Sequence, residues 1–398
     1  MTFLADGMTL ARGETLADAL PVWRRFAAQK PALLLLSNDP ALLPAPEPLR
    51  GAIAETLRTA PDAAVRAAGD PLRPAPLFLP GMSVDLALRQ GWLRELVWVF
   101  PQSDGGQELK LEVLREQLTG NRLADSAEAA TLQLTGKTVG GRLRGVPFRA
   151  APLAHLPQPD GPVIVHIDLS YVHKSHKNEI ATPVIPLVGG ILQQLKAKHL
   201  PVLAVTFSYN HGDGSIPLGV RFLGDFVAAL VEKPERLDQP LPRRWQAQKD
   251  MLYLENFFQK DDIRKLVEEQ TKDSPDAAWV QFNRYHVAAL FKEGDQALAH
   301  LASAVALDRM YAVEYLTLAE RAGAAGRPAQ ELRMMELAGA AFPENVLIKL
   351  RIAELRAAAG DNSAARTLAA ELLQLPWSAT YYPDMREYLH DFLAKLEK

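Results

Sequence analysis

The histidines of this chain gather in one short stretch. Six of the nine lie between residues 155 and 211, whereas the first 150 residues contain none. The six are His155, His166, His173, His176, His199 and His211. The same stretch carries Asp168, Glu179 and Asp213. Imidazoles and carboxylates act as general acids and bases and as ligands for divalent metal ions. Residues 155–214 are therefore where chemistry is expected.

The core of this stretch has the pattern of a buried strand that ends at an acid. Residues 163–169 read Val-Ile-Val-His-Ile-Asp-Leu, and a polar loop is expected over 170–179. In open α/β sheets the ligand crevice lies outside the carboxyl ends of the strands, so Asp168 is expected to face it. His166 shares a face with Asp168 by strand alternation, and a hydrogen-bonded structural role is favoured for it.

Three further predicted strands end in polar residues that would reach the same edge of the sheet. These residues are Ser37 to Asp39, Gln102 to Asp104, and His211 with Asp213. The predicted metal ligands, for one divalent ion such as Zn or Mn, are Asp168, His173, His176 and His211. The predicted ligand-binding residues are Asp39, Asp104, Ser170, Tyr171, Glu179 and Asp213. No catalytic residue is assigned.

Simpler roles compete with each of these assignments. Asp168 could cap a helix or a loop. His173 and His176 lie among Lys174 and Lys177, so a solvated or anion-binding loop is as consistent with the pattern as metal ligation. His199 fits the C-terminus of a helix, where a cation meets the helix dipole favourably.

The first 240 residues alternate strand and helix patterns, which indicates an α/β domain with a mainly parallel sheet. Strands are expected at 32–36, 95–100, 163–169 and 202–207, and helices at 15–29, 48–58, 83–90, 107–118, 182–198 and 220–231. Residues 132–148 read as two strands around a glycine-containing turn. A proline-rich passage from Pro71 to Pro80 suggests an extended connection. Gly136, Lys137 and Thr138 are not a phosphate loop, because Thr131 stands where that motif needs glycine.

The predicted secondary structure changes near residue 250. Pro234 to Pro242 is the expected linker, and no strand pattern follows it. Gly294, Gly326 and Gly360 recur in similar turns, with Leu318, Ala319, Ala338 and Pro343 around the middle one. Over about 275–378 this pattern resembles the tetratricopeptide repeat family. The resemblance implies, for domain 250–398, stacked helix pairs with a concave face for a protein or peptide partner. A helical bundle that braces the first domain is the alternative.

Composition narrows the function classes. The 398 residues carry a net charge of −3, which gives no general attraction to nucleic acid or to anionic membranes. No run of about 18 apolar residues suggests a membrane span. The absence of cysteine excludes disulfides, thiolate metal sites and cysteine nucleophiles. With no targeting segment recognised, the cytoplasm is slightly favoured, but the compartment stays open.

Around Asp168 the first domain resembles the arginase and histone deacetylase fold. Its enzymes are metal-dependent hydrolases with a three-layer α/β architecture, and one of their metal motifs ends a strand in Asp-x-Asp or Asp-x-His, often followed by an aromatic residue. Asp168 and Tyr171 match this motif, whereas Ser170 stands at the second ligand position. The earlier Asp-x-His-x-Asp motif is absent. Over about 30–232, the resemblance therefore implies a degenerate or lost metal centre.

Three functions follow as expectations. The first is a catalytically degenerate arginase-like domain, over 1–240, that binds a small polar ligand or a partner, coupled to a repeat domain that recruits a protein. The second is an active metal-dependent hydrolase acting on a C–N bond of a small polar substrate. The third is a scaffold protein that uses both domains as surfaces.

Overall fold

The computed structural model describes residue 8 and residues 10–101, 110–210 and 216–397. The chain forms two compact units. The α/β unit comprises Met1–Arg66 and Leu79–Ser274, and the helical unit comprises Ala67–Phe78 and Pro275–Lys398. A short internal segment thus belongs with the C-terminal helices.

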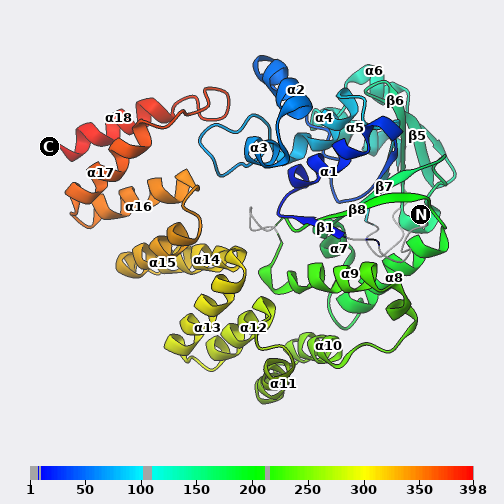
Figure 1. Ribbon diagram of the computed structural model, residues 1–398. Helices are drawn as coiled ribbons and strands as arrows, with labels where there is room; N and C mark the ends of the chain where they lie inside the picture. The colour runs from blue at the N-terminus through cyan, green and yellow to red at the C-terminus, as the bar shows by residue number, and fades with distance from the viewer. Residues whose placement is uncertain (1–7, 9, 102–109, 211–215, 398) are drawn as a thin grey trace. The chain divides into compact units, whose positions relative to one another are not determined.

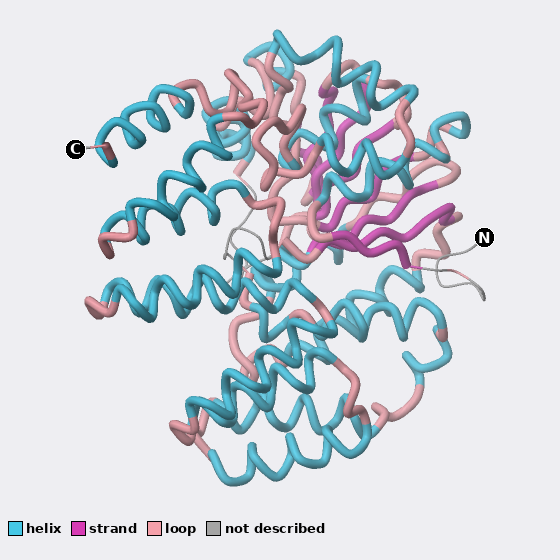
Figure 2. Tube along the Cα trace, turned by 60° about the vertical axis from the view of Figure 1, so that its left-hand side comes forward, coloured by secondary structure: helices cyan, strands magenta, loops and turns pink. Residues whose placement is uncertain are grey.

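The α/β unit is built on one eight-stranded sheet, drawn in magenta in Figure 2. Its strands are β1 (Leu10–Gly13), β2 (Ala32–Leu36), β3 (Glu95–Val99), β4 (Gln133–Thr135), β5 (Thr138–Leu143), β6 (Val146–Ala151), β7 (Val163–Asp168) and β8 (Val202–Ser208). The spatial order is β1-β8-β7-β2-β3-β6-β5-β4. All neighbouring strands are parallel except the pairs β4–β5 and β5–β6. The prediction of a mainly parallel sheet is confirmed.

Helices lie on both sides of this sheet, and Figure 1 shows α1 and α4 on one side and α8 and α9 on the other. The helices of these chain segments are α1 (Leu20–Arg25), α2 (Arg50–Thr59), α3 (Asp62–Ala68), α4 (Ser83–Arg89), α5 (Leu111–Gly120), α6 (Ser126–Ala130), α7 (Leu169–Ser175), α8 (Val184–Ala197), α9 (Phe222–Glu232), α10 (Arg243–Glu255) and α11 (Lys260–Asp273). β2, β3 and β7 are buried along their whole length, as strands covered on both faces must be.

Two local predictions differ from the structure, and one strand was not predicted. The polar loop expected after β7 begins as the helix α7, because the Asp168 side chain accepts a hydrogen bond from the Ser170 amide and caps it. Residues 132–148 were expected to hold two strands, whereas β4, β5 and β6 form there. β1 had no recognisable strand pattern, since Leu-Ala-Arg-Gly is short and lies at the sheet edge.

The division between the units comes after Ser274, later than the boundary predicted between residues 240 and 250. The physical reason is α10. Its buried Trp245 packs on Phe222 and Phe226 of α9, with ring centroids 6.1 and 5.2 Å apart. This aromatic contact keeps α10 and the neighbouring α11 in the α/β unit.

The helical unit is a succession of helix pairs that ends in a single helix. Its helices are α12 (Ala278–Leu290), α13 (Gly294–Leu307), α14 (Val313–Ala324), α15 (Pro328–Ala341), α16 (Val346–Ala358), α17 (Asn362–Leu373) and α18 (Met385–Leu396). Each even-numbered helix from α12 to α16 packs against its successor. Gly326 and Gly360 adopt positive φ in the turns of the second and third pairs, but in the first pair Lys292 takes this role and Gly294 begins α13.

The proline-rich passage is a closed loop and not the extended connection that its prolines suggested. The Leu77 amide donates to the Ala68 carbonyl at 2.8 Å, which brings the two ends of the loop together. Asp70 accepts from the Leu72 amide at 3.0 Å and forms the turn between them. Residues 67–78 pack with the C-terminal helices.

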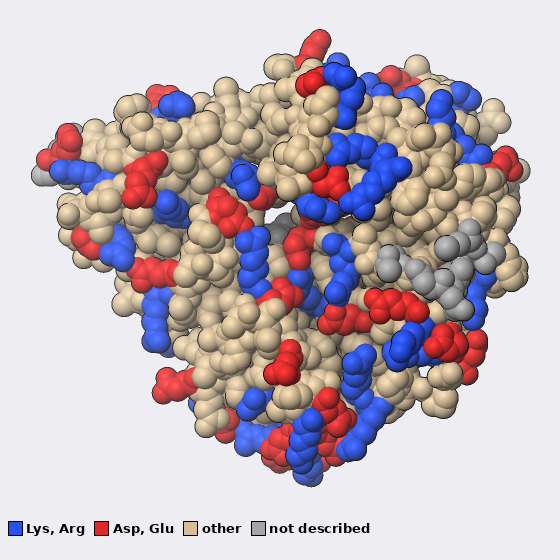
Figure 3. Space-filling model, in the orientation of Figure 1, with Lys and Arg blue, Asp and Glu red and all other residues tan. Residues whose placement is uncertain are grey.

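Two surface properties bear on partners. No helix within the described ranges is long and apolar enough to cross a membrane. On the face drawn in Figure 3, lysine and arginine side chains are interspersed with aspartate and glutamate.

Candidate functional site

In the sheet, β2 lies between β3 and β7. After β2 the chain goes to β3 on one side, and later in the sequence it forms β7 on the other side. Such a reversal opens a crevice at the carboxyl ends of the two diverging connections. Here the Asn38 amide, just after β2, donates to the Ser170 hydroxyl, just after β7, at 3.3 Å. Asn38 and the predicted site residue Ser170 therefore lie next to each other at the carboxyl ends of β2 and β7.

Asp168 ends β7 as a buried carboxylate whose hydrogen-bond partners among the described residues are neutral donors. It is 1 % exposed. One oxygen accepts from the Ser170 amide at 2.8 Å, and the other accepts from the Ser208 hydroxyl at 2.5 Å and from the Asn210 side-chain amide. Burial raises the pKa of Asp168, and these hydrogen bonds oppose the rise. The carboxylate is thus held inside the protein by its own chain.

A hydrogen-bonded chain runs from Asp168 back into the core. The His166 ring nitrogens lie 3.0 Å from the Ser208 hydroxyl oxygen (Nε2) and 2.8 Å from that of Thr206 (Nδ1). Because Ser208 gives its single proton to Asp168, Nε2 of His166 must donate to Ser208 and Nδ1 must accept from Thr206. Full burial lowers the pKa of His166 to about 3, which agrees with a neutral ring.

This hydrogen-bonded chain contains a carboxylate, a serine and an imidazole, but not in the order that activates a nucleophile. In a hydrolase triad the imidazole accepts the serine proton. Here Asp168 accepts it, and Ser208 is completely buried. Trp23 of α1 covers the chain, with its ring edge-on to His166 at 5.8 Å. The arrangement stabilises the carboxyl ends of β7 and β8 and exposes no attacking group. The structural role favoured for His166 matches these contacts.

Beside Asp168, Glu14, which follows β1, forms a partly exposed ion pair with Arg221, which precedes α9. Arg221, 6 % exposed, donates to both carboxylate oxygens of Glu14 at 2.9 and 2.6 Å and lies over the Tyr209 ring at 4.1 Å. The Asn210 amide donates to the Glu14 carbonyl at 2.8 Å. No sequence pattern indicated Glu14 or Arg221. For the partners of Asp168, the available signal was Ser208, a polar residue directly after the predicted strand 202–207.

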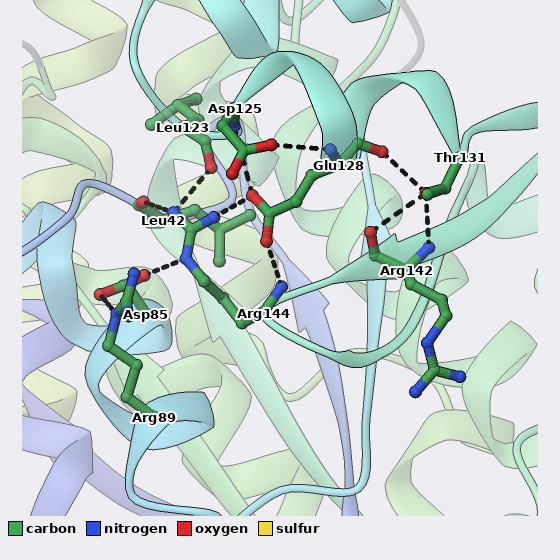
Figure 4. Close-up of polar contacts among 9 residues, drawn as sticks. All are labelled: Leu42, Asp85, Arg89, Leu123, Asp125, Glu128, Thr131, Arg142 and Arg144. Atoms are coloured by element: carbon green, nitrogen blue, oxygen red, sulfur yellow. Dashed lines mark hydrogen bonds and ion pairs between the residues drawn. The ribbon is translucent and has the colours of Figure 1, made fainter.

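The loop after β2 is fixed from the far side by Arg144, in the turn between β5 and β6 (Figure 4). Its guanidinium pairs with Asp85 and Glu128 and donates to the Leu42 and Leu123 carbonyls at 3.1 and 3.0 Å. The loop also holds Asp39, which is exposed and accepts from the Ala41 amide at 2.6 Å. Partial burial of its carboxyl raises the pKa of Asp39, and the hydrogen bond from the Ala41 amide opposes the rise.

The remaining predicted residues on α7 and after it do not converge on the Asp168 carboxylate. Tyr171 is buried, and burial raises its pKa. His173 is exposed, and its pKa is lowered by partial burial and by its neighbours His176 and Lys174. His176 lies 2.9 Å from Glu179, which also accepts from the Val184 amide at the start of α8. Burial, together with the Glu179 charge, raises the pKa of Glu255 to about 7.

The described residues do not fit the predicted metal ion. Both Asp168 oxygens are occupied by protein donors, as above, and no group of three or more His, Asp or Glu side chains within the described ranges could hold a metal. His211, Asp213 and Asp104 lie outside the described residues. Metal ligation that includes His211 stays a prediction.

No protein-family model matches the chain, and no curated protein matches its sequence.

Proposed function

We propose that the α/β unit is a catalytically degenerate relative of the arginase and deacetylase fold that binds a small polar ligand at the carboxyl edge of its sheet. The observation that carries this proposal is the internal saturation of Asp168 by Ser170, Ser208 and Asn210. A two-metal hydrolase needs several carboxylates free to bridge its ions. Here the one acid that matches the motif is already occupied.

The polar groups left at this edge suggest the chemistry of the ligand. Asn38 and Asp39 are exposed after β2, and His173 is exposed on α7. A carboxylate and an amide side by side in the loop after β2 suit a ligand that carries an amine or amide donor. Such a ligand would be held by Asp39, while Asp168 keeps the crevice in shape.

For the helical unit we propose a protein-binding role, in keeping with its likeness to tetratricopeptide repeats. A groove of about 570 Å³ lies among α15, α16 and α17. Phe342, Ile352 and Leu368 line it, together with Lys349 and Arg356. An apolar floor with charged margins is the usual composition of a peptide-binding surface.

A thermal-shift screen of small amines and amides tests the ligand proposal. At a concentration 100 times its Kd, a ligand stabilises the folded protein by about 2.7 kcal/mol, which raises Tm by several degrees. Compounds that stabilise the parent are expected to lose the effect in Asp39→Asn and to keep it in Asp276→Asn, an exposed acid of the helical unit. Equal shifts in both variants would place the ligand elsewhere.

A further inference from the structure

The loop 67–78 is held by the C-terminal helices in the way a protein holds a peptide. In Figure 1 the loop that follows α3 lies beside the connection between α17 and α18. Four of its carbonyl oxygens accept hydrogen bonds from that side of the helical unit. The donors are the Tyr382 hydroxyl to Pro71 (3.4 Å), the Val346 amide to Leu72 (3.3 Å), the Ser378 amide to Pro74 (2.9 Å) and the Tyr381 hydroxyl to Leu77 (3.3 Å).

One of these donors is a helix terminus that the loop completes. Asn345 caps α16 and accepts from the Leu347 and Ile348 amides. The Val346 amide, at the first helical position, therefore has no partner within the helix and turns to the Leu72 carbonyl. The loop supplies the acceptor that this helix terminus requires.

A hydrophobic cluster supports the surface that receives the loop. Val346, Trp377 and Leu389 are buried there together, and Tyr382 packs against them. The Trp377 and Tyr382 rings meet edge to face at 5.3 Å, and the Trp377 indole donates to the Leu372 carbonyl at 2.7 Å. This packing positions Tyr382 and also Ser378, which directly follows Trp377.

We infer that Val346, Ser378, Tyr381 and Tyr382 form a peptide-binding site whose resident ligand is the chain's own proline-containing loop, residues 67–78. Prolines lack an N–H, so a loop rich in them is recognised through its carbonyl oxygens, and all four contacts are of this kind. This inference rests on the proposed protein-binding role of the helical unit. It specifies a partner that presents a proline-containing turn and competes with the internal loop.

The direct test uses the full-length chain with Pro71–Pro76 replaced by six Gly and Ser residues. A cyclised, fluorescent peptide of residues 67–78 is titrated into this variant and into the parent. We expect the variant to bind with a micromolar Kd and the parent to bind at least about tenfold more weakly, because the tethered loop competes at a millimolar effective concentration. A folded variant that does not bind, or a parent that binds equally well, would overturn the inference.

Should the loop replacement prevent folding, the unaltered loop still allows a test. Arg73, at the exposed tip of the loop, is followed by Pro74 and is a site for clostripain, which cleaves after arginine even when proline follows. In the Tyr381→Phe, Tyr382→Phe double variant, loss of both hydroxyl donors should speed cleavage at Arg73 about tenfold, because cleavage follows the population of the open loop. Mass spectrometry measures this cut separately from others.

The matched control is Tyr388→Phe, an exposed tyrosine of α18 whose hydroxyl donates to Glu354 and not to the loop. Its Arg73 cleavage rate should equal that of the parent. Equal rates in the double variant and the control contradict the inference. Neither experiment involves the carboxyl edge of the sheet, so failure here leaves the ligand proposal for the α/β unit to be judged by its own screen.

Discussion

Replacing Arg144 by methionine is expected to lower the free energy of unfolding of the α/β unit by about 3–5 kcal/mol. The Arg144 side chain is 8 % exposed and pairs with Asp85, which is fully buried, and with Glu128. Methionine fills much of the same space but leaves the Asp85 carboxylate with only the half-exposed Arg89 as partner. The Leu42 and Leu123 carbonyls also lose their donor.

The control for this prediction is Arg142→Met, two residues away on β5. Arg142 is exposed and its side chain contacts only the nearby turn, at the Gly145 carbonyl. Its replacement should change stability by less than about 0.5 kcal/mol. Urea unfolding followed by circular dichroism measures both variants. If Arg144→Met proves as mild as Arg142→Met, the ion pairs of Figure 4 do not hold this part of the fold together.

Acidification is expected to destabilise the α/β unit through His166. Its pKa is about 3 in the folded protein and 6.5 in the unfolded chain, so the unfolded state binds the proton first as pH falls. The His166 contribution to stability is complete above pH 6.5 and is lost between pH 6.5 and about 3. The loss amounts to about 4 kcal/mol at the lower limit, since each pKa unit corresponds to about 1.4 kcal/mol.

As pH falls, Asp168 changes the stability in the direction opposite to that of His166, so the two contributions must be separated. Its pKa is raised in the folded state, so its contribution is present at low pH and is lost as pH rises through the folded pKa. The informative quantity is therefore the difference between the parent and His166→Gln across pH 3 to 7. His173→Gln, at an exposed position, should follow the parent. Parallel curves for the parent and His166→Gln would show that burial of His166 does not perturb its titration.

Local sequence patterns predicted the central strands well and the contacts of their ends poorly. β2 lies at the predicted residues 32–36, and β7 ends at Asp168, one residue before the predicted end, because a run of Val, Ile and Leu bounded by polar residues is a strong strand signal. α7 was missed because its seven residues are too few to show a helical period. What forms it is the Asp168 cap, a contact that hydrophobic periodicity does not reveal.

The contacts of the site depend on strand order, which local sequence patterns do not reveal. Ser208 and Asn210 meet Asp168 because β8 lies beside β7, and Asn38 meets Ser170 because β2 lies on the other side. The contacts of the loop 67–78 are even further from any local sequence pattern. Its partners are about 300 residues away in the chain, as with Leu77 and Tyr381, and no local pattern indicates such a pairing.

The metal content of full-length protein, purified without a histidine tag and dialysed against Mn²⁺ and Zn²⁺ in turn, tests the degenerate-centre proposal most directly. Inductively coupled plasma mass spectrometry counts the ions retained per chain. Because the Asp168 oxygens are occupied by Ser170, Ser208 and Asn210, we predict well below one ion per chain, and the same count in Asp168→Asn. Two ions per chain that disappear in Asp168→Asn would contradict the proposal and favour an active metal-dependent hydrolase.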